Sequence, residues 1–297
     1  MPETVSDIAS AARLWELSDV TAIADSPTSL VYRAHQTKQS VIVKILKPAG
    51  LEEATGMDFL RWRGGKGAIR VLAQQDNAYL LEDGGNHTVR EYYNHRGDRE
   101  AVWELRNAVR HLHTQSPAPY PQTLVPLELH FLALFDATAN SVRGEHAILF
   151  DWARQLARRL LAAQTYVRPL HGDIHHGNLV SPVIDAGWKA IDPKGLIGDP
   201  AYDFANIFGN PVDEPDKVLA PERCLWLASE LCWSPSSGSD FHRDLTELKL
   251  LHYAAVHSVL SACWSLEGAP SAQDVQNATQ RLALAEILKS LIEGRNR

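Results

Sequence analysis

The residues best suited to chemistry lie in one short stretch, HGDIHHGN, at positions 171–178. Three histidines, an aspartate and an asparagine share this stretch with two glycines, which loosen the backbone. Two kinds of site use such residues: a transition-metal site with histidine ligands, or a loop that handles a phosphate and its magnesium ion. The order H-x-D-x-H-H only superficially resembles the H-x-H-x-D-H pattern of binuclear hydrolases, and the remaining ligands would have to come from elsewhere.

The spacing of Asp173 and Asn178 favours phosphate chemistry. In the pattern H-R-D-x-x-x-x-N of protein-kinase catalytic loops, the aspartate accepts the proton of the substrate hydroxyl and the asparagine binds magnesium. Asp173 and Asn178 are separated by the same number of residues. One tight loop could therefore present a catalytic base, Asp173, and a magnesium ligand, Asn178.

A second magnesium ligand is expected on a neighbouring strand. The stretch WKAID predicts a short apolar strand that ends at Asp192, beside Asn178. A site with oxygen ligands only suits Mg²⁺ far better than Zn²⁺.

A lysine that binds the α and β phosphates of ATP is expected upstream. The stretch SVIVKIL places Lys44 on a strand, in the context where kinases carry this lysine. Its partner would be a glutamate at the start of the next helix, either Glu52 or Glu53. We prefer Glu53, because the helix then packs on Met57 and Leu60 with that glutamate facing inward.

The elements around these residues predict two lobes. Residues 1–83 contain a short amphipathic helix, β-branched strands joined by polar turns, and a helix over 52–62, an arrangement expected to form a small nucleotide-binding lobe. Gly84 and Gly85 mark a hinge at about 82–87. Residues 88–297 are expected to form a larger catalytic and substrate-binding lobe. Its predicted helices cover 100–113, 144–164, 219–233, 241–266 and 271–293.

Composition narrows the possible partners and the compartment. The formal net charge of -7 argues against general binding of nucleic acid or anionic lipid and would suit a cationic small molecule. The N-terminus lacks the features of a secretory signal, and no apolar run reaches the ~18 residues of a membrane helix. The three cysteines are too few for a disulfide framework. We expect a cytoplasmic protein with no nucleic-acid or membrane partner.

The stretch LHGDIHHGN, followed by WKAIDPKGLIGDPAYDFANIFGNP, resembles the aminoglycoside phosphotransferases, in the branch of streptomycin 6-kinases and hydroxyurea phosphotransferases. The resemblance is strongest over residues 170–211. It implies an α+β, protein-kinase-like fold of two lobes: a small antiparallel sheet with a helix, and a larger, mostly helical lobe. It also implies ATP and Mg²⁺ as cofactors and a small hydroxylated acceptor.

The resemblance assigns further roles by position. The hinge backbone around Leu81 to Asp83 would bind adenine, His171 would brace the loop, and Asp203 would tie it down. The hairpin DSPTSLVYRA lacks the glycines that cover phosphate in protein kinases, so Ser29 or Thr28 would contact phosphate instead.

Several alternatives remain open from the sequence. Lys194 stands where D-F-G has its glycine, and we hypothesise that it reaches a phosphate or the product. The acceptor could be streptomycin, hydroxyurea or another metabolite. A nucleotide-binding module without activity and a metal-dependent hydrolase are the competing functional classes.

Overall fold

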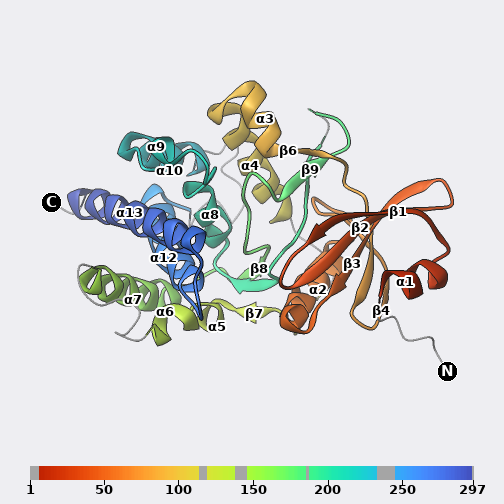
Figure 1. Cartoon of the computed structure of the whole chain (residues 1–297). Helices are drawn as coiled ribbons and strands as arrows, with labels where there is room; N and C mark the ends of the chain where they lie inside the picture. The colour runs from red at the N-terminus through yellow and green to blue at the C-terminus, as the bar shows by residue number, and fades with distance from the viewer. Residues whose placement is uncertain (1–6, 114–118, 138–145, 185–186, 233–244, 296–297) are drawn as a thin grey trace.

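The fold is described by a computed structural model over residues 7–113, 119–137, 146–184, 187–232 and 245–295. A five-stranded antiparallel sheet with two flanking helices forms one part of the molecule, and a larger helical part lies beside it (Figure 1). None of the described helices is both long enough and apolar enough to cross a membrane.

The sheet has the strand order β1-β2-β3-β5-β4. Its strands are β1 (Leu17–Asp25), β2 (Ser29–Gln36), β3 (Gln39–Leu46), β4 (Val71–Gln75) and β5 (Ala78–Glu82). Alternate residues of β3 face opposite sides, as the pleat requires. Val43 and Ile45 pack in a small core with Ala11 and Trp15, so helix α1 (Ile8–Leu14) covers that face. Lys44, between them in sequence, belongs to the opposite face.

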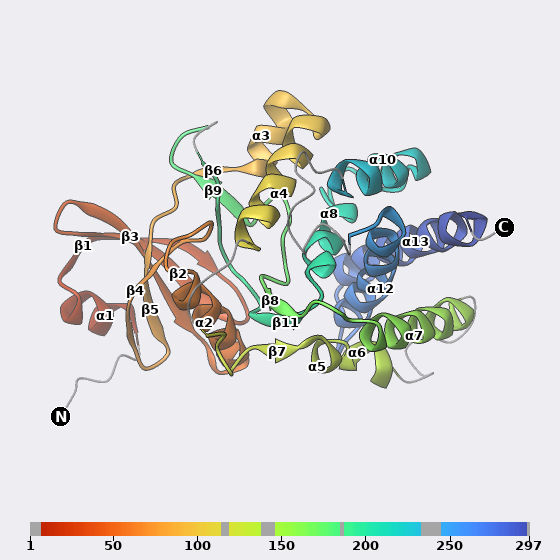
Figure 2. The ribbon, with the colours of Figure 1, turned by 180° about the vertical axis from the view of Figure 1, so that it is seen from behind.

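Helix α2 (Ala54–Arg63) covers this second face and is preceded by a 3₁₀ helix, η1 (Pro48–Glu53). The predicted helix over 52–62 is therefore present, with its first turn tightened. It ends at Gly64, whose φ of 56° lies in the left-handed region. Figure 2 shows α2 between the sheet and the rest of the chain.

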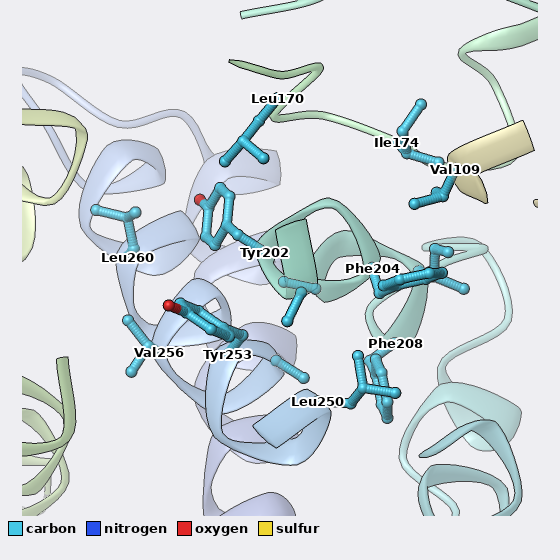
Figure 3. Close-up of a cluster of buried hydrophobic side chains, with 14 of the residues drawn as sticks. Val109, Leu170, Ile174, Tyr202, Phe204, Phe208, Leu250, Tyr253, Val256 and Leu260 are labelled. Carbon is cyan, nitrogen blue, oxygen red and sulfur yellow. The ribbon is translucent and has the colours of Figure 1, made fainter. Parts of the chain in front are cut away.

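The larger part consists mainly of helices. They are α3 (Val89–Arg96), α4 (Asp98–Leu112), α5 (Leu127–His130), α6 (Leu132–Asp136), α7 (Ala147–Ala162), α8 (Ala205–Phe208), α9 (Pro215–Val218), α10 (Pro221–Cys232), α12 (Glu247–Ser265) and α13 (Ala272–Arg295). Helix α12 is buried along most of its length. Its residue Tyr253 packs against Tyr202 of the short 3₁₀ helix η2 (Pro200–Phe204), and Leu250 lies beside Phe208 of α8, as Figure 3 shows.

Two small sheets carry the segments with the candidate chemistry. One has the order β10-β9-β6, from β6 (His87–Thr88), β9 (Leu179–Ser181) and β10 (Lys189–Ala190). The other has the order β7-β11-β8, from β7 (Val125–Pro126), β8 (Arg168–Leu170) and β11 (Leu196–Gly198). The loop 171–178 therefore runs from β8 to β9.

Close backbone contacts join α2 to the segment between β10 and β11. A Cβ atom on Gly56 would lie 1.9 Å from the carbonyl oxygen of Pro193, and one on Gly195 would lie 2.3 Å from the carbonyl oxygen of Thr55. The Thr55 hydroxyl also donates to the Lys194 carbonyl oxygen at 2.8 Å. Only glycine allows the two backbones to approach so closely.

The sequence-based elements agree with the structure in most places. The helix expected at 241–266 begins at Glu247, where Thr246 caps its first turn. Residues 241–244 of this expected helix lie outside the described part of the chain. Helix α3 was not predicted. It follows the glycine-rich segment directly and begins with a capping box formed by Thr88 and Glu91. The lobe boundary at 83 and the hinge at 82–87 remain predictions, although β5 does end at Glu82.

Candidate active site

Three charged residues from separate segments meet at the face of the sheet that α2 covers. Lys44 Nζ lies 2.7 Å from Glu53 Oε2 and 3.0 Å from Asp192 Oδ1. Burial acts to lower the pKa of the Lys44 ammonium, but Asp192 and Glu53 outweigh it and hold the pKa above its usual range. The lysine is thus a buried cation. Of the two glutamates considered, Glu53 is the one this contact involves.

Asp192 follows a strand that is paired with the end of the loop 171–178. Strand β10 pairs with β9, and the pairing continues where Ile191 N–H donates to the Asn178 carbonyl oxygen at 3.0 Å. One residue later Asp192 has a φ of 53°, a left-handed conformation that aspartate tolerates better than most residues. This turn directs its carboxylate back toward Lys44.

Asn178 and Asp173 are linked within the loop itself. The amide nitrogen of Asn178 donates to the backbone carbonyl oxygen of Asp173 at 2.9 Å. This bond occupies the amide nitrogen, so the amide oxygen is left to face a cation. This amide oxygen and the second carboxylate oxygen of Asp192 are oxygen donors of the kind that Mg²⁺ prefers. The residues present therefore fit a magnesium ion.

The Asp173 carboxylate is held by the segment that follows η2. Its Oδ1 atom accepts a hydrogen bond of 2.8 Å from the amide of Asn206, and Asn210 donates in turn to the Asn206 backbone and side-chain oxygens. Burial acts to raise the pKa of Asp173, but the nearby His175 and Lys194 outweigh it and keep the pKa below its ordinary value. The carboxylate is therefore ionised and fixed in direction.

Asp203 anchors the start of the loop 171–178. Its two carboxylate oxygens accept hydrogen bonds from the backbone N–H groups of His171, at 3.2 Å, and Gly172, at 2.6 Å. One of them also lies 2.9 Å from His113 Nε2. The side chain is completely buried, so the groups that contact it stabilise its charge in place of water.

The three histidines of the loop have three different surroundings. His171 is buried, and its Nε2 atom lies 2.9 Å from the Ile191 carbonyl oxygen. His175 Nδ1 accepts a hydrogen bond from Gly177 N–H at 3.0 Å. His176 is buried with its ring edge-on to Tyr93, 5.6 Å between centroids. The rings therefore serve the loop's own structure and are not directed at one shared ion.

The other predicted nucleotide-binding residues lie in β2, in β5 and just after β5. Ser29 is buried at the start of β2, and its N–H donates to the Ser26 hydroxyl at 3.0 Å. Leu81 is buried in β5. The Asp83 carboxylate accepts from Arg33, Ser40 and the Gly85 backbone, so its side chain shapes the turn after β5. Nucleotide contacts by Ser29, Leu81 and Asp83 remain predictions.

Asn206 is the functional candidate that sequence reasoning missed. It lies in the stretch AYDFAN, in which the resemblance assigns a role to Asp203 alone. Asp203 belongs to η2, whereas Asn206 lies three residues later in the following helix α8. Its contact with Asp173 crosses 33 residues of sequence, so local patterns could not reveal it.

Known proteins with similar sequences are kinases. A family model described as "Aminoglycoside/hydroxyurea antibiotic resistance kinase" matches residues 14–268. The chain belongs to this family. The match confirms the resemblance found in residues 170–211, and it confirms that the chain belongs to a class of phosphotransferases.

Individual relatives agree with the family. The chain is 39% identical to a streptomycin 3''-kinase of Klebsiella pneumoniae over 187 residues, covering 62% of this chain and 67% of the relative. It is 26% identical to a streptomycin 6-kinase of Streptomyces griseus over 198 residues, covering 64% and 62%. The matched segments thus span about two thirds of the relatives' lengths.

The fold has solved counterparts. A choline/ethanolamine kinase family protein from Mesorhizobium loti superimposes with a TM-score of 0.66 at 16% sequence identity, covering 95% of this chain and 91% of that one. At this identity the likeness concerns the fold alone. It confirms the predicted protein-kinase-like architecture, with an antiparallel sheet followed by a larger helical part.

Proposed function

We propose that this protein transfers the γ-phosphoryl group of ATP to a hydroxyl of a small acceptor of the streptomycin type. The observation that carries the proposal is the meeting of four separated segments: Lys44, Glu53, the Asp173–Asn178 loop and Asp192. These are the charges that phosphoryl transfer needs, namely a cation for phosphates, a base, and oxygen ligands for magnesium. The streptomycin kinases among the relatives support the choice of acceptor.

Each residue would have one task. Asp173, directed by Asn206, accepts a hydrogen bond from the acceptor hydroxyl and takes its proton as the oxygen attacks phosphorus. Lys44 donates to the phosphates and is kept in place by Glu53. Asn178 and Asp192 would hold Mg²⁺, which neutralises charge on the phosphate oxygens when it is bound. The phosphoryl group passes directly from ATP to the acceptor oxygen, without a covalent intermediate on the protein.

Mass spectrometry provides the direct test of this function. Purified protein is incubated with Mg²⁺ and ATP and a panel of streptomycin, other aminoglycosides, hydroxyurea and amino alcohols, and the products are searched for a phosphate adduct. We expect a phosphorylated streptomycin and one ADP per product. Product from hydroxyurea or another metabolite alone would reassign the acceptor. ATP binding with no product from any acceptor would instead indicate a nucleotide-binding module.

Replacing Lys44 by methionine should impair the use of ATP. The buried ammonium is the group that pairs with both Glu53 and Asp192, and methionine has similar length without charge. We expect kcat/KM for ATP to fall about 10²-fold, the usual cost of losing one preorganised donor to developing charge. Lys38→Met, in the exposed turn between β2 and β3, is the matched control. Equal rates for both variants would contradict a role of Lys44 in phosphate binding.

The pH dependence should show no ionisation of the base above about pH 5. The pKa of Asp173 lies below its ordinary value of 3.8 in the folded protein, and a carboxylate is ionised at every pH above its pKa. The profile of kcat/KM for the acceptor at saturating ATP should therefore lack an acidic limb from Asp173 between about pH 5 and 8. An acidic limb near pH 6 that persists with acceptors of different pKa would contradict this assignment.

A further inference from the structure

A guanidinium group lies within electrostatic reach of the candidate base Asp173. It belongs to Arg281 of α13. A Cβ atom on Gly209 would lie 1.7 Å from Arg281 Nη1 and 2.6 Å from its Cζ, so the guanidinium rests directly on the backbone of Gly209. Gly209 stands between Asn206 and Asn210, the residues that hold Asp173. Helix α13, in the helical part of the molecule (Figure 1), thus brings Arg281 to the segment that carries Asn206 and Asn210.

Arg281 has an unused hydrogen-bond donor. Its Nη1 atom is buried and has no hydrogen-bond partner among the described residues. A buried donor without a partner costs about 1–3 kcal/mol, and a ligand oxygen that accepts from it would recover that cost. Burial lowers the pKa of the guanidinium to about 10, and the opposing influence comes from Asp173. The group is therefore still a cation at neutral pH.

A cluster of mostly buried neutral rings lies near Arg281, which acts electrostatically on His257. Tyr202 Oη lies 2.9 Å from His130 Nε2 and 3.0 Å from His257 Nδ1. Burial lowers the pKa of His130 to about 4 and that of His257 to about 3, so both imidazoles are uncharged near neutral pH. Asp173 acts electrostatically on both histidines and on Tyr202. Tyr202 and His257 are buried, so this cluster lies behind the candidate base and contributes no further charge beside Arg281.

We propose that Arg281 is an acceptor-binding residue, whose Nη1 donates a hydrogen bond to an oxygen atom next to the hydroxyl that is phosphorylated. The inference deepens the proposed function and rests on it. It also specifies the acceptor: a molecule with an oxygen substituent next to the phosphorylated hydroxyl, on the side of α13. A cationic group of the acceptor would point away from Arg281, because two like charges without water between them repel.

Acceptor binding can be measured separately from transfer. Streptomycin is titrated by calorimetry into the full-length wild type and into Arg281→Met and Arg281→Lys, in the presence of Mg²⁺ and a non-hydrolysable ATP analogue. We expect Kd to rise about 10-fold or more for Arg281→Met, as for the loss of a hydrogen bond from a charged group. Arg281→Lys should recover part of the affinity. Arg295→Gln, at the exposed end of the same helix, should bind as the wild type does.

A second variant moves the guanidinium without removing it. Gly209→Ala places a methyl group where Nη1 lies, so Arg281 must shift. We expect weaker streptomycin binding with an unchanged KM for ATP. Thermal unfolding of each variant identifies those that are folded before binding is compared.

The outcomes separate the inference from the proposed function. Unchanged Kd in folded Arg281→Met would overturn the inference, even if streptomycin is phosphorylated. A fall in kcat with unchanged Kd would also overturn it, because Arg281 would then act on the transferred phosphoryl group. Wild-type protein that binds streptomycin without transferring phosphate would overturn the proposed function alone. Absence of streptomycin binding to the wild type would overturn both.

Discussion

Asp173→Asn should lower kcat for acceptor phosphorylation by about 10³-fold, within the usual range for removing a positioned general base. The substituted amide keeps the size of the carboxylate and leaves an oxygen that Asn206 can still reach, so the loop should keep its shape. What is lost is the group that accepts the acceptor's proton. KM for ATP should change little, because Lys44 and Asp192 are untouched. Steady-state kinetics with varied ATP and varied acceptor measures both quantities.

The control for this experiment is Asp216→Asn, an exposed carboxylate in the first turn of α9. It should have wild-type kinetics. If Asp173→Asn retained more than a tenth of wild-type kcat, Asp173 could not be the catalytic base, and its role would be limited to positioning the acceptor.

Asp203→Ala should lower the free energy of unfolding by about 3 kcal/mol, the lower end of the cost of breaking a buried charged pair. Alanine leaves the N–H groups of His171 and Gly172 buried without their acceptor and leaves His113 without its carboxylate. The loop that carries Asp173 would then lose its anchor. We expect kcat to fall about 10²-fold as well, since small displacements of a catalytic group have costs of that size. Urea denaturation and steady-state kinetics test the two parts.

Asp213→Ala is the matched control for stability. Asp213 is exposed and pairs with Arg90 at 2.7 Å, so its loss should cost about 1 kcal/mol or less. Equal losses of stability in the two variants would show that the buried position of Asp203 has no special importance for the fold.

The sequence alone predicted which charged residues lie close together where the contact depends on short-range geometry. Asp173 and Asn178 share one loop, and Asp192 follows a strand that pairs with the end of that loop, so their spacing in sequence fixes their proximity in space. The contact between Lys44 and Glu53 was also predictable, because one short connection joins β3 to α2. In each case the separation along the chain was small or the strand pairing was evident.

Residues that reach the site from distant segments were not predictable. Asn206 contacts Asp173 and Arg281 interacts with it electrostatically, yet no spacing pattern marks either residue. Arg281 lies on α13, where an arginine in an amphipathic pattern ordinarily faces water. Its position depends on how α13 packs beside α12 and on the absence of a side chain at Gly209. Both conditions are tertiary and leave no trace in local spacing.

The histidines show that a conspicuous pattern can have a structural explanation. Their clustering first suggested a metal site, but in the structure His171 and His175 complete the hydrogen bonds of the loop backbone. His176 fills space against Tyr93. The backbone of a tight loop makes few hydrogen bonds to itself, so its side chains must supply the missing partners. An imidazole can act as a hydrogen-bond acceptor, as a donor or as a flat packing surface.

The glycine contacts between α2 and the segment after Asp192 have a consequence for nucleotide binding. At Gly56 and Gly195 backbone meets backbone, with no side chain between them that could change rotamer. The separation between the lysine that would receive the phosphates and the carboxylate that would receive the metal is therefore set before any ligand arrives. ATP would enter a preorganised site, and less of its binding energy would be spent on ordering the protein.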